Sequence, residues 1–148
     1  MTVSRQPMRR WARIAVLGLA VLALGAQAAG LGRAQRNKLA QYQDAYVAAV
    51  RWSDFEAALD LVDPQVRERS PVSALELERY RQLQVSGYRE RSTLVHDDGS
   101  VERRMELRVV NRNTMAEREL SVSERWRWDA KAKRWWQAGG LPDLWQGQ

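Results

Sequence analysis

Two charged residues, Arg103 and Glu124, are the strongest candidates for chemistry in this chain of 148 residues. Each interrupts the apolar side of a stretch in which apolar and charged residues alternate, and such alternation predicts a β-strand. If Met105 faces Val122 in an antiparallel pairing of these stretches, Arg103 faces Glu124. A desolvated carboxylate at that point is a candidate general base, and the arginine would orient it or bind an anionic ligand. The other interpretation, which we favour, is a structural ion pair near the open edge of the sheet.

Aromatic side chains extend this candidate site. Tyr42 and Tyr46 fall on one face of a predicted helix, and Trp126 lies two residues after Glu124 on the same strand face. The candidate ligand-binding residues are therefore Tyr42, Tyr46, Arg103, Glu124 and Trp126, with Tyr46 as a candidate proton donor. The alternative is that the tyrosine rings fill the core and send their hydroxyl groups to partners at its rim.

Other catalytic chemistry has little support in this sequence. The chain has no cysteine, which excludes a disulfide scaffold, a cysteine nucleophile and a thiolate zinc site. Its single histidine, His96, precedes a predicted turn, where we expect a solvated loop side chain. The chain also lacks a glycine-rich phosphate loop, a nucleophile elbow and a zinc-protease helix. We expect no metal and no cofactor.

Tryptophan is the unusual component of this sequence. The chain has seven tryptophans, and four of them fall within residues 126–136. Trp135 and Trp136 are neighbours on a predicted strand, so their rings point to opposite faces and one of them lies outside the core. An outward ring, together with Trp145 in the C-terminal segment, would offer an aromatic patch to a partner. Trp135, Trp136 and Trp145 are therefore the candidate partner-binding residues, and the partner is an envelope protein, a polysaccharide or a second copy of the chain in a homodimer.

Three helices are expected to support these side chains. Residues 33–51 carry apolar side chains at spacings of three and four, which predicts an amphipathic helix. Ser53 and Glu56 have the spacing of a capping box for a second helix, which Asp63-Pro64 would end. Ser73 and Glu76 repeat that spacing at the start of a third helix.

Four strands are expected after the helices. From about Leu83 the apolar period changes to two, with predicted turns at residues 96–99, 111–114 and 129–133 and a last strand at 134–138. Short connections favour an antiparallel meander whose apolar face receives the helices. We therefore predict an α+β fold in which three N-terminal helices pack on a bent four-stranded antiparallel sheet, preceded by a signal peptide or anchor helix. The predicted domain covers residues 34–142, after a short linker at 29–33 and before a tail at 143–148.

The order of these elements resembles the nuclear transport factor 2-like, or cystatin-like, α+β cone superfamily. The resemblance rests on the helix and break from Tyr46 to Pro64, where Ser53 stands in place of the glycine often seen at the break. It rests also on Glu124-Arg125-Trp126-Arg127-Trp128 and on Lys133-Arg134-Trp135-Trp136 after a turn. The superfamily includes isomerases, dehydratases, transport adaptors and secretion components, so the resemblance leaves the function open.

The N-terminal segment, residues 1–28, has the parts of an export signal. Arg9, Arg10 and Arg13 form a positive flank before an apolar run at 14–26, and Ala26-Gln27-Ala28 offers small residues for a signal peptidase. A helix over that run rises about 20 Å, which is less than the roughly 30 Å hydrocarbon core of a bilayer. We therefore favour cleavage; the alternative is an uncleaved anchor in which residues 9–31 meet the inner membrane. Both place the domain in the periplasm or outside a bacterium.

The net charge of +6 and the pI near 10.3 do not predict a nucleic-acid-binding protein. Four of the 24 basic residues lie in the first 28 residues, which contain no acid. The remainder of the chain is nearly balanced, and acidic residues share the ionic strand face with the arginines.

Two hypotheses of function follow. The preferred one is a non-enzymatic exported binding or accessory domain that uses an apolar cone or a Trp-rich hairpin to bind a small apolar ligand or an envelope protein. The alternative is an isomerase or dehydratase in which Glu124 is the base, Arg103 orients it and a tyrosine donates a proton.

Overall fold

Helices and strands segregate along the chain as the sequence predicts. The computed structural model describes residues 30–146, and the predicted signal peptide lies outside them. Within this range the helices are α1 (Arg33–Arg51), α2 (Phe55–Asp60), α3 (Pro64–Arg69) and α4 (Ala74–Arg81). The strands are β1 (Leu83–Val95), β2 (Val101–Asn111), β3 (Glu117–Asp129) and β4 (Arg134–Gln137). The predicted α+β class is therefore confirmed. No helix within residues 30–146 is both long and apolar enough to cross a membrane.

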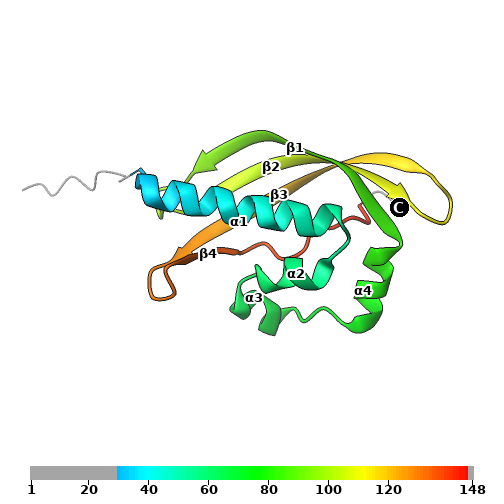
Figure 1. The fold of residues 1–148 in the computed structure, drawn as a ribbon, viewed down its shortest axis with the longest axis horizontal. Coiled ribbons are helices and arrows are strands. Elements are labelled where there is room, and N and C mark those ends of the chain that lie inside the picture. Colours follow the sequence, from blue (N-terminus) through cyan, green and yellow to red (C-terminus); the bar gives the residue numbers. More distant parts are fainter. Residues whose placement is uncertain (1–29, 147–148) are drawn as a thin grey trace, which may run out of the picture.

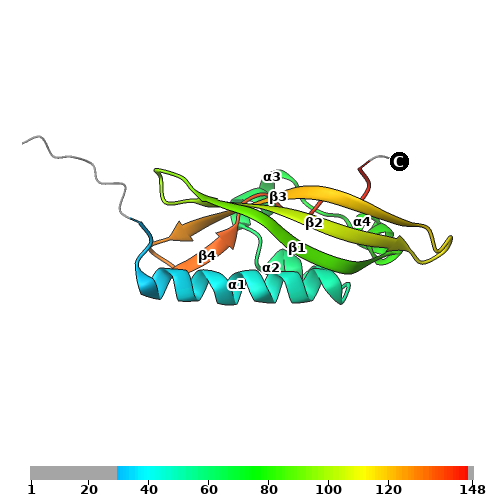
Figure 2. The same ribbon diagram turned by 90° about the horizontal axis from the view of Figure 1, so that it is seen from above.

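The strands form one antiparallel sheet in the order β1-β2-β3-β4, joined by three turns. Gly99 in the first turn has a φ of +77°, a conformation that glycine adopts without steric cost. Helix α1 lies along one face of the sheet and contacts both edge strands, β1 and β4. The sheet therefore curves around α1, and Figure 2 shows the helix running beneath it.

Alternation of residue types decides which face of the sheet α1 covers. In β2 the inward positions are buried and apolar except for Arg103, and the outward positions from Glu102 to Arg108 are charged. On the outer face, opposite charges pair across strands, as in Arg89–Glu106 at 2.6 Å and Arg125–Glu102 at 3.3 Å. Helix α1 contributes Leu39, Tyr46, Ala49 and Val50 to the core, at the spacing of one helical face.

The cap of α2 differs from the prediction. Asp54, and not Ser53, caps the helix, because its carboxylate accepts a hydrogen bond from the Ala57 amide at 3.1 Å. Ser53 has a left-handed backbone with φ of 60° and reverses the chain between α1 and α2. Glu56 pairs with Arg81 of α4 instead of closing a capping box. The predicted capping box of Ser73 and Glu76 on α4 is confirmed.

A further helix, α3, makes four helices where three were expected. Pro64 was expected to end the second helix, but α2 ends earlier, at Asp60, and Pro64 opens α3. Proline suits this first position because its fixed φ is helical and its missing N–H would have no helical partner there. Asp63 caps the new helix by accepting from the Gln65 amide at 2.9 Å.

Asp63 also links α3 to the sheet, and this contact makes stability depend on pH. Its buried carboxylate accepts a hydrogen bond from the Arg127 guanidinium, which lowers the pKa of Asp63 below its ordinary value. Stabilisation from a depressed carboxyl pKa is present above the unfolded-state value, about 4, and is lost as pH falls through the folded-state value. We expect Asp63→Asn, which preserves the cap, to be less stable than the wild type at pH 7. The two stabilities should converge as the pH falls below the folded-state pKa of Asp63.

Urea denaturation at a series of pH values between 2 and 7 measures this convergence. Asp60→Asn is the matched control, because Asp60 is exposed and its contact with Arg67 is 3.7 Å long. A constant difference between Asp63→Asn and the wild type across this range would contradict the assignment.

The two edges of the sheet are protected from pairing with another chain in different ways. The edge of β4 is covered by the segment before α3, where Asp63 donates its amide to the Gln137 carbonyl and Gln137 donates to the Leu61 carbonyl, both at 2.9 Å. Strand β1 is the other edge, and its pairing with β2 shifts at two irregular positions, after Val85 and after Glu90. Such shifts twist an edge strand and hinder its pairing with another chain.

Candidate functional site

The structure brings together the charged pair that the sequence predicts. Strands β2 and β3 pair in the expected register, with Met105 opposite Val122 and Arg103 opposite Glu124. The Arg103 guanidinium donates to Oε2 of Glu124 from Nη2 at 2.7 Å and from Nε at 3.2 Å. The pair does not lie at an open edge, because Arg103 is 7% exposed and Glu124 is 1% exposed.

Other donors occupy the remaining acceptor positions of Glu124. Oε2 also accepts from Nε1 of Trp126 at 2.9 Å, and Oε1 accepts from the Tyr88 hydroxyl. On the solvent side, Nη1 of Arg103 contacts Glu90 at 3.4 Å. The carboxylate is thus held by an arginine, an indole and a phenol. A base in this arrangement has to break a hydrogen bond before it can take a proton from a substrate.

Tyr46 is close to this network but does not donate to it. Its ring is fully buried and meets Trp126 edge-on, with centroids 5.7 Å apart. Its hydroxyl donates to the Gly140 carbonyl at 2.9 Å. Burial, followed by the negative charge of Glu124, raises the pKa of Tyr46 well above its ordinary value. The hydroxyl therefore stays protonated and ties α1 to the segment after β4.

Tyr42 lies apart from the network. Its ring is half-buried beneath the Arg134 guanidinium, 5.1 Å from the ring centroid, and it lines a separate surface groove with Lys38 and Gln41. Five residues were expected to share one ligand site. Four of them, including Glu124, lie together, whereas Tyr42 lies apart at the surface.

Tyr88 is the member of the network that sequence reasoning missed. It reaches Glu124 because the pairing of β1 with β2 shifts after Val85, which turns Tyr88 toward the same face as Leu107. Desolvation raises the pKa of the Tyr88 phenol, and the charge of Glu124 adds to this effect. Gly87 was the only sequence signal of this irregular position. A Cβ added there would lie just 3.1 Å from the Arg108 side chain, so the position favours glycine.

Side chains fill the space between the helices and the sheet. Trp126, Trp135, Tyr46, Phe55 and Leu107 are all fully buried there. Five of the cavities in the described part of the chain are lined by other residues, and Arg103, Tyr46 and Glu124 line none of these five.

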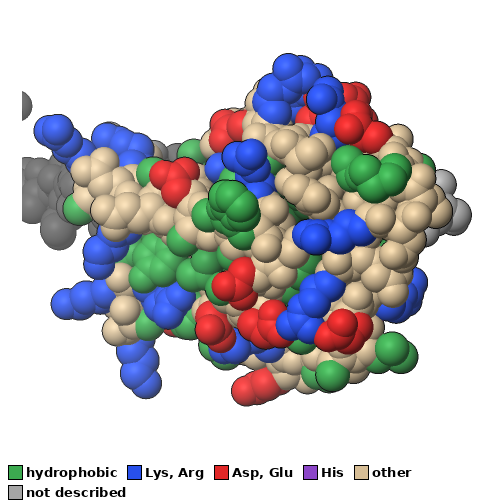
Figure 3. Space-filling view, turned by 45° about the vertical axis from the view of Figure 1, so that its right-hand side comes forward, with side chains coloured by type: hydrophobic (Ala, Val, Ile, Leu, Met, Phe, Trp, Pro, Cys, Tyr) green, Lys and Arg blue, Asp and Glu red, His purple; other side chains and the backbone are tan. Residues whose placement is uncertain are grey.

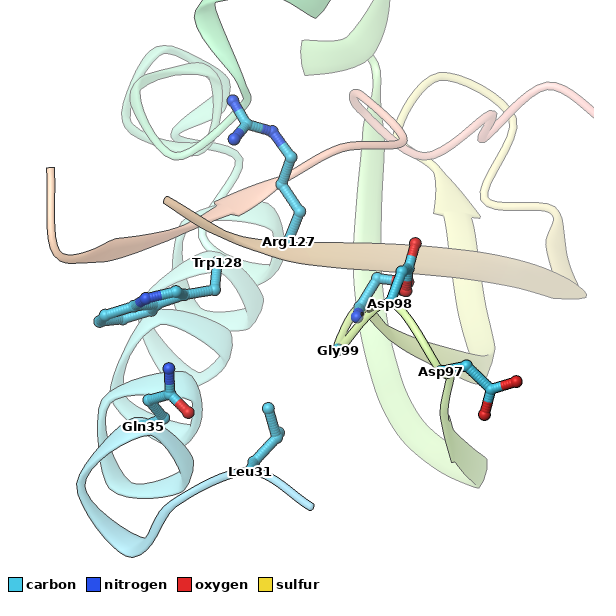
Figure 4. Close-up of a pocket in the computed structure, with 8 residues that line it drawn as sticks. Leu31, Gln35, Asp97, Asp98, Gly99, Arg127 and Trp128 are labelled. Carbon is cyan, nitrogen blue, oxygen red and sulfur yellow. Dashed lines mark hydrogen bonds between the residues drawn. The ribbon is translucent and has the colours of Figure 1, made fainter. Parts of the chain in front are cut away.

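A larger cavity lies at the end of the sheet where α1 begins, and we call it the end cleft. Its volume is about 590 Å³, and its lining comes from the start of α1, the β1–β2 turn and the end of β3. Figure 4 shows Trp128 and Gln35 on one side and Asp98 with Gly99 on the other, while the Arg127 side chain extends away toward α3. The complete lining is Leu31, Gln35, Asp97, Asp98, Gly99, Ser100, Arg127 and Trp128.

The end cleft combines an aromatic wall with fixed hydrogen-bonding groups. The Trp128 ring is half-buried and is supported edge-on by Trp135, at a centroid distance of 5.6 Å. Oδ1 of Asp98 accepts from the hydroxyl of Ser100 at 2.6 Å and from its amide at 2.8 Å, which lowers the pKa of Asp98 and keeps it charged. The sequence predicted the turn around Asp98 and the alternation that includes Trp128, but no short-range signal places one beside the other.

The tryptophans expected to bind a partner do not form one patch. Trp135 is fully buried, and its Nε1 donates to the Gln35 carbonyl at 3.0 Å. Trp136 lies on the opposite face, half-buried, with the Arg134 guanidinium 3.6 Å from its ring centroid. Trp145 packs near Arg79 at the other end of the sheet, where the C-terminal segment ends in Figure 1. Its neighbour Leu144 is fully buried, so this part of the predicted tail packs on the domain.

The lone histidine and the acidic residues make no metal site. His96 lies in the β1–β2 turn, 3.2 Å from Glu102. Within residues 30–146 no group of three histidine, aspartate or glutamate side chains could hold a metal ion.

Comparisons of the chain with protein-family models, with curated proteins and with solved structures found no match.

Proposed function

We propose that this protein is an exported, non-enzymatic accessory domain of the bacterial cell envelope that binds a protein segment or small ligand in the end cleft. The observation that carries the proposal is a cleft of about 590 Å³ whose lining includes the half-buried Trp128. Ligand sites are typically concave, with an apolar surface and a few fixed polar groups. Here Trp128 and Leu31 supply the apolar surface, and Gln35 and Asp98 supply hydrogen-bonding groups.

The environment of Glu124 favours binding over catalysis. The carboxylate is 1% exposed and receives hydrogen bonds from three side chains. A substrate reaching it would have to displace the packed aromatic core. The isomerase or dehydratase hypothesis therefore has less support than the binding hypothesis.

We also propose that the fold is a nuclear transport factor 2-like, or cystatin-like, cone. The support is the order of elements: a long helix that contacts both edges of a curved sheet, short helices after it, and a meander that ends in a Trp-rich hairpin, β3–β4. The proposed location in the periplasm or outside the cell rests on the charged, apolar and small-residue parts of residues 1–28.

Trp128→Ala tests the proposed cleft. We expect it to weaken capture of a specific envelope component by at least tenfold, because the largest apolar surface of the cleft is lost. The tagged protein is expressed in a bacterium that exports it, complexes are purified from the envelope, and the captured component is then titrated in purified form by calorimetry.

Trp52→Ala is the matched control. Trp52 is 84% exposed and follows the last residue of α1, at the opposite end of that helix from the cleft. Equal binding by Trp128→Ala and the wild type, with both folded, would contradict the proposal. Equal losses in both variants would also contradict it, since they would show nonspecific adhesion to exposed tryptophan.

A further inference from the structure

One end of the domain carries a cluster of basic side chains. The first turns of α1 and the β3–β4 turn meet there, and the two segments, residues 30–43 and 130–136, contain no acid. Figure 3 shows Lys and Arg side chains projecting at this end of the molecule. We call the cluster the basic end, and it consists of Arg33, Arg36, Lys38, Lys131, Lys133 and Arg134.

Direct contacts hold the two segments of the basic end together. Lys38 donates from Nζ to the Lys133 carbonyl at 3.1 Å, and the buried Trp135 ring is tied to α1 through the Gln35 carbonyl. In Figure 1 the β3–β4 turn lies at the same end of the molecule as the start of α1. The positive charges are therefore assembled by the fold from segments that are distant in sequence.

The basic side chains of this end are not held in ion pairs within the described residues. Among the ion pairs found within residues 30–146, none involves any of its six side chains. Arginines on the outer sheet face behave differently, because Arg89, Arg108 and Arg125 each have a glutamate partner. The nearby Asp129 accepts hydrogen bonds from Trp136 and from the amides of Lys131 and Ala132.

An aromatic pair completes the surface. The Arg134 guanidinium lies over the rings of both Trp136 and Tyr42, at 3.6 Å and 5.1 Å from their centroids, and its buried Nε has no hydrogen-bond partner. Tryptophan and tyrosine next to basic side chains are typical of surfaces at the level of lipid headgroups.

We infer that the basic end docks on the anionic phospholipid surface of a membrane. Charge complementarity supports this partner, because clustered lysines and arginines are attracted to anionic lipid headgroups. Position along the chain supports it too. The apolar run predicted to enter the membrane ends at residue 26, and Gly30 is four residues later, a distance of at most about 14 Å even in an extended chain. While residues 1–28 remain attached, the basic end would thus be close to the headgroups. None of the six basic side chains lines the end cleft, although Lys38 lies 5.8 Å from the centroid of the Trp128 ring, and the inference does not depend on the proposed ligand.

Lipid-quenching of a single fluorophore tests the inference on the full chain. The chain has no cysteine, so Ala132→Cys in the β3–β4 turn and Ala116→Cys before β3 each give one labelling position. The labelled proteins are reconstituted in vesicles of phosphatidylcholine alone or with 30% phosphatidylglycerol, with a headgroup-level quencher. We expect strong quenching at position 132 and weak quenching at 116, only with the anionic lipid, and its loss in 0.5 M salt.

Charge reversal tests whether the basic end causes the docking. Lys131→Glu with Lys133→Glu is expected to lower the ratio of docked to undocked protein about 25-fold or more, because each basic residue near an anionic bilayer contributes roughly fivefold. Arg51→Glu with Arg104→Glu makes the same change in net charge at exposed positions elsewhere, and we expect it to leave docking nearly unchanged.

Several outcomes would overturn the inference. Quenching that is equal in neutral and anionic vesicles, equal at positions 132 and 116, or equally reduced by both double variants would each do so. An acidic protein as the true partner would give the first of these results, with no dependence on phosphatidylglycerol.

Discussion

Replacing Arg103 with Met is expected to lower the free energy of unfolding by about 3–5 kcal/mol. The substitution keeps most of the side-chain volume but removes the positive charge that lies 2.7 Å from Glu124. Glu124 would then be a buried carboxylate held only by the neutral donors Tyr88 and Trp126. Urea or thermal denaturation followed by circular dichroism measures the loss.

A second variant separates the lost charge from lost packing. In Arg103→Met combined with Glu124→Gln, no charge is buried at this position and the amide oxygen still accepts a hydrogen bond. We expect the double variant to lose less than about 2 kcal/mol, since removing both members of a buried pair costs far less than removing one.

An exposed pair on the same sheet is the control. Arg89 and Glu106 face each other across β1 and β2 at 2.6 Å, and Arg89→Met is expected to cost no more than about 1 kcal/mol. If Arg103→Met were no more harmful than Arg89→Met, the carboxylate would not depend on its partner. That outcome would leave the catalytic hypothesis for Glu124 open again.

Neighbouring tryptophans give the second large effect. Trp135→Ala is expected to cost about 3–5 kcal/mol, because the ring is fully buried and its indole bonds to α1. Trp136→Ala is expected to cost about 1–2 kcal/mol, through loss of its contact with Arg134 and its hydrogen bond to Asp129 at 3.1 Å. Denaturation in urea, at equal protein concentration, compares the two.

If Trp135→Ala does not fold, Trp135→Phe provides a milder test. It retains a ring but removes the hydrogen bond to Gln35, and we expect a loss of about 1–3 kcal/mol. A Trp136 variant less stable than the corresponding Trp135 variant would mean that β4 presents its faces the other way round.

Short-range patterns were sufficient for the faces of β2 and β3, and the structure selected one of the registers that preserve those faces. Alternation fixes which side chains share a face, and the turn at 111–114 limits how far one strand can slide past the other. The observed register pairs Met105 with Val122, and Arg103 therefore faces Glu124 as expected for that register. The same patterns were insufficient for Tyr88, because the first of two irregular positions in β1 moves residues 87–90 to the other face before the second restores the alternation.

At two helix boundaries, the local sequence was compatible with more than one outcome. Ser53 and Asp54 are both good capping residues, and the sharp turn between α1 and α2 placed Ser53 in a left-handed conformation that left the cap to Asp54. Asp63-Pro64 fits the end of one helix and the start of another, and contacts with Arg127 and Gln137 accompany the second outcome.

By itself, the amino-acid sequence determined the α+β class, the succession of helices and then strands, the turns and the residues that share a strand face, since each depends on residue period and spacing along the chain. Only the tertiary structure decided that Glu124 is enclosed, that Trp135 and not Trp136 is in the core, and that the end cleft and the basic end exist. Those features depend on which distant segments meet when the sheet curves around α1, and burial, cavities and surface charge arise from that meeting alone.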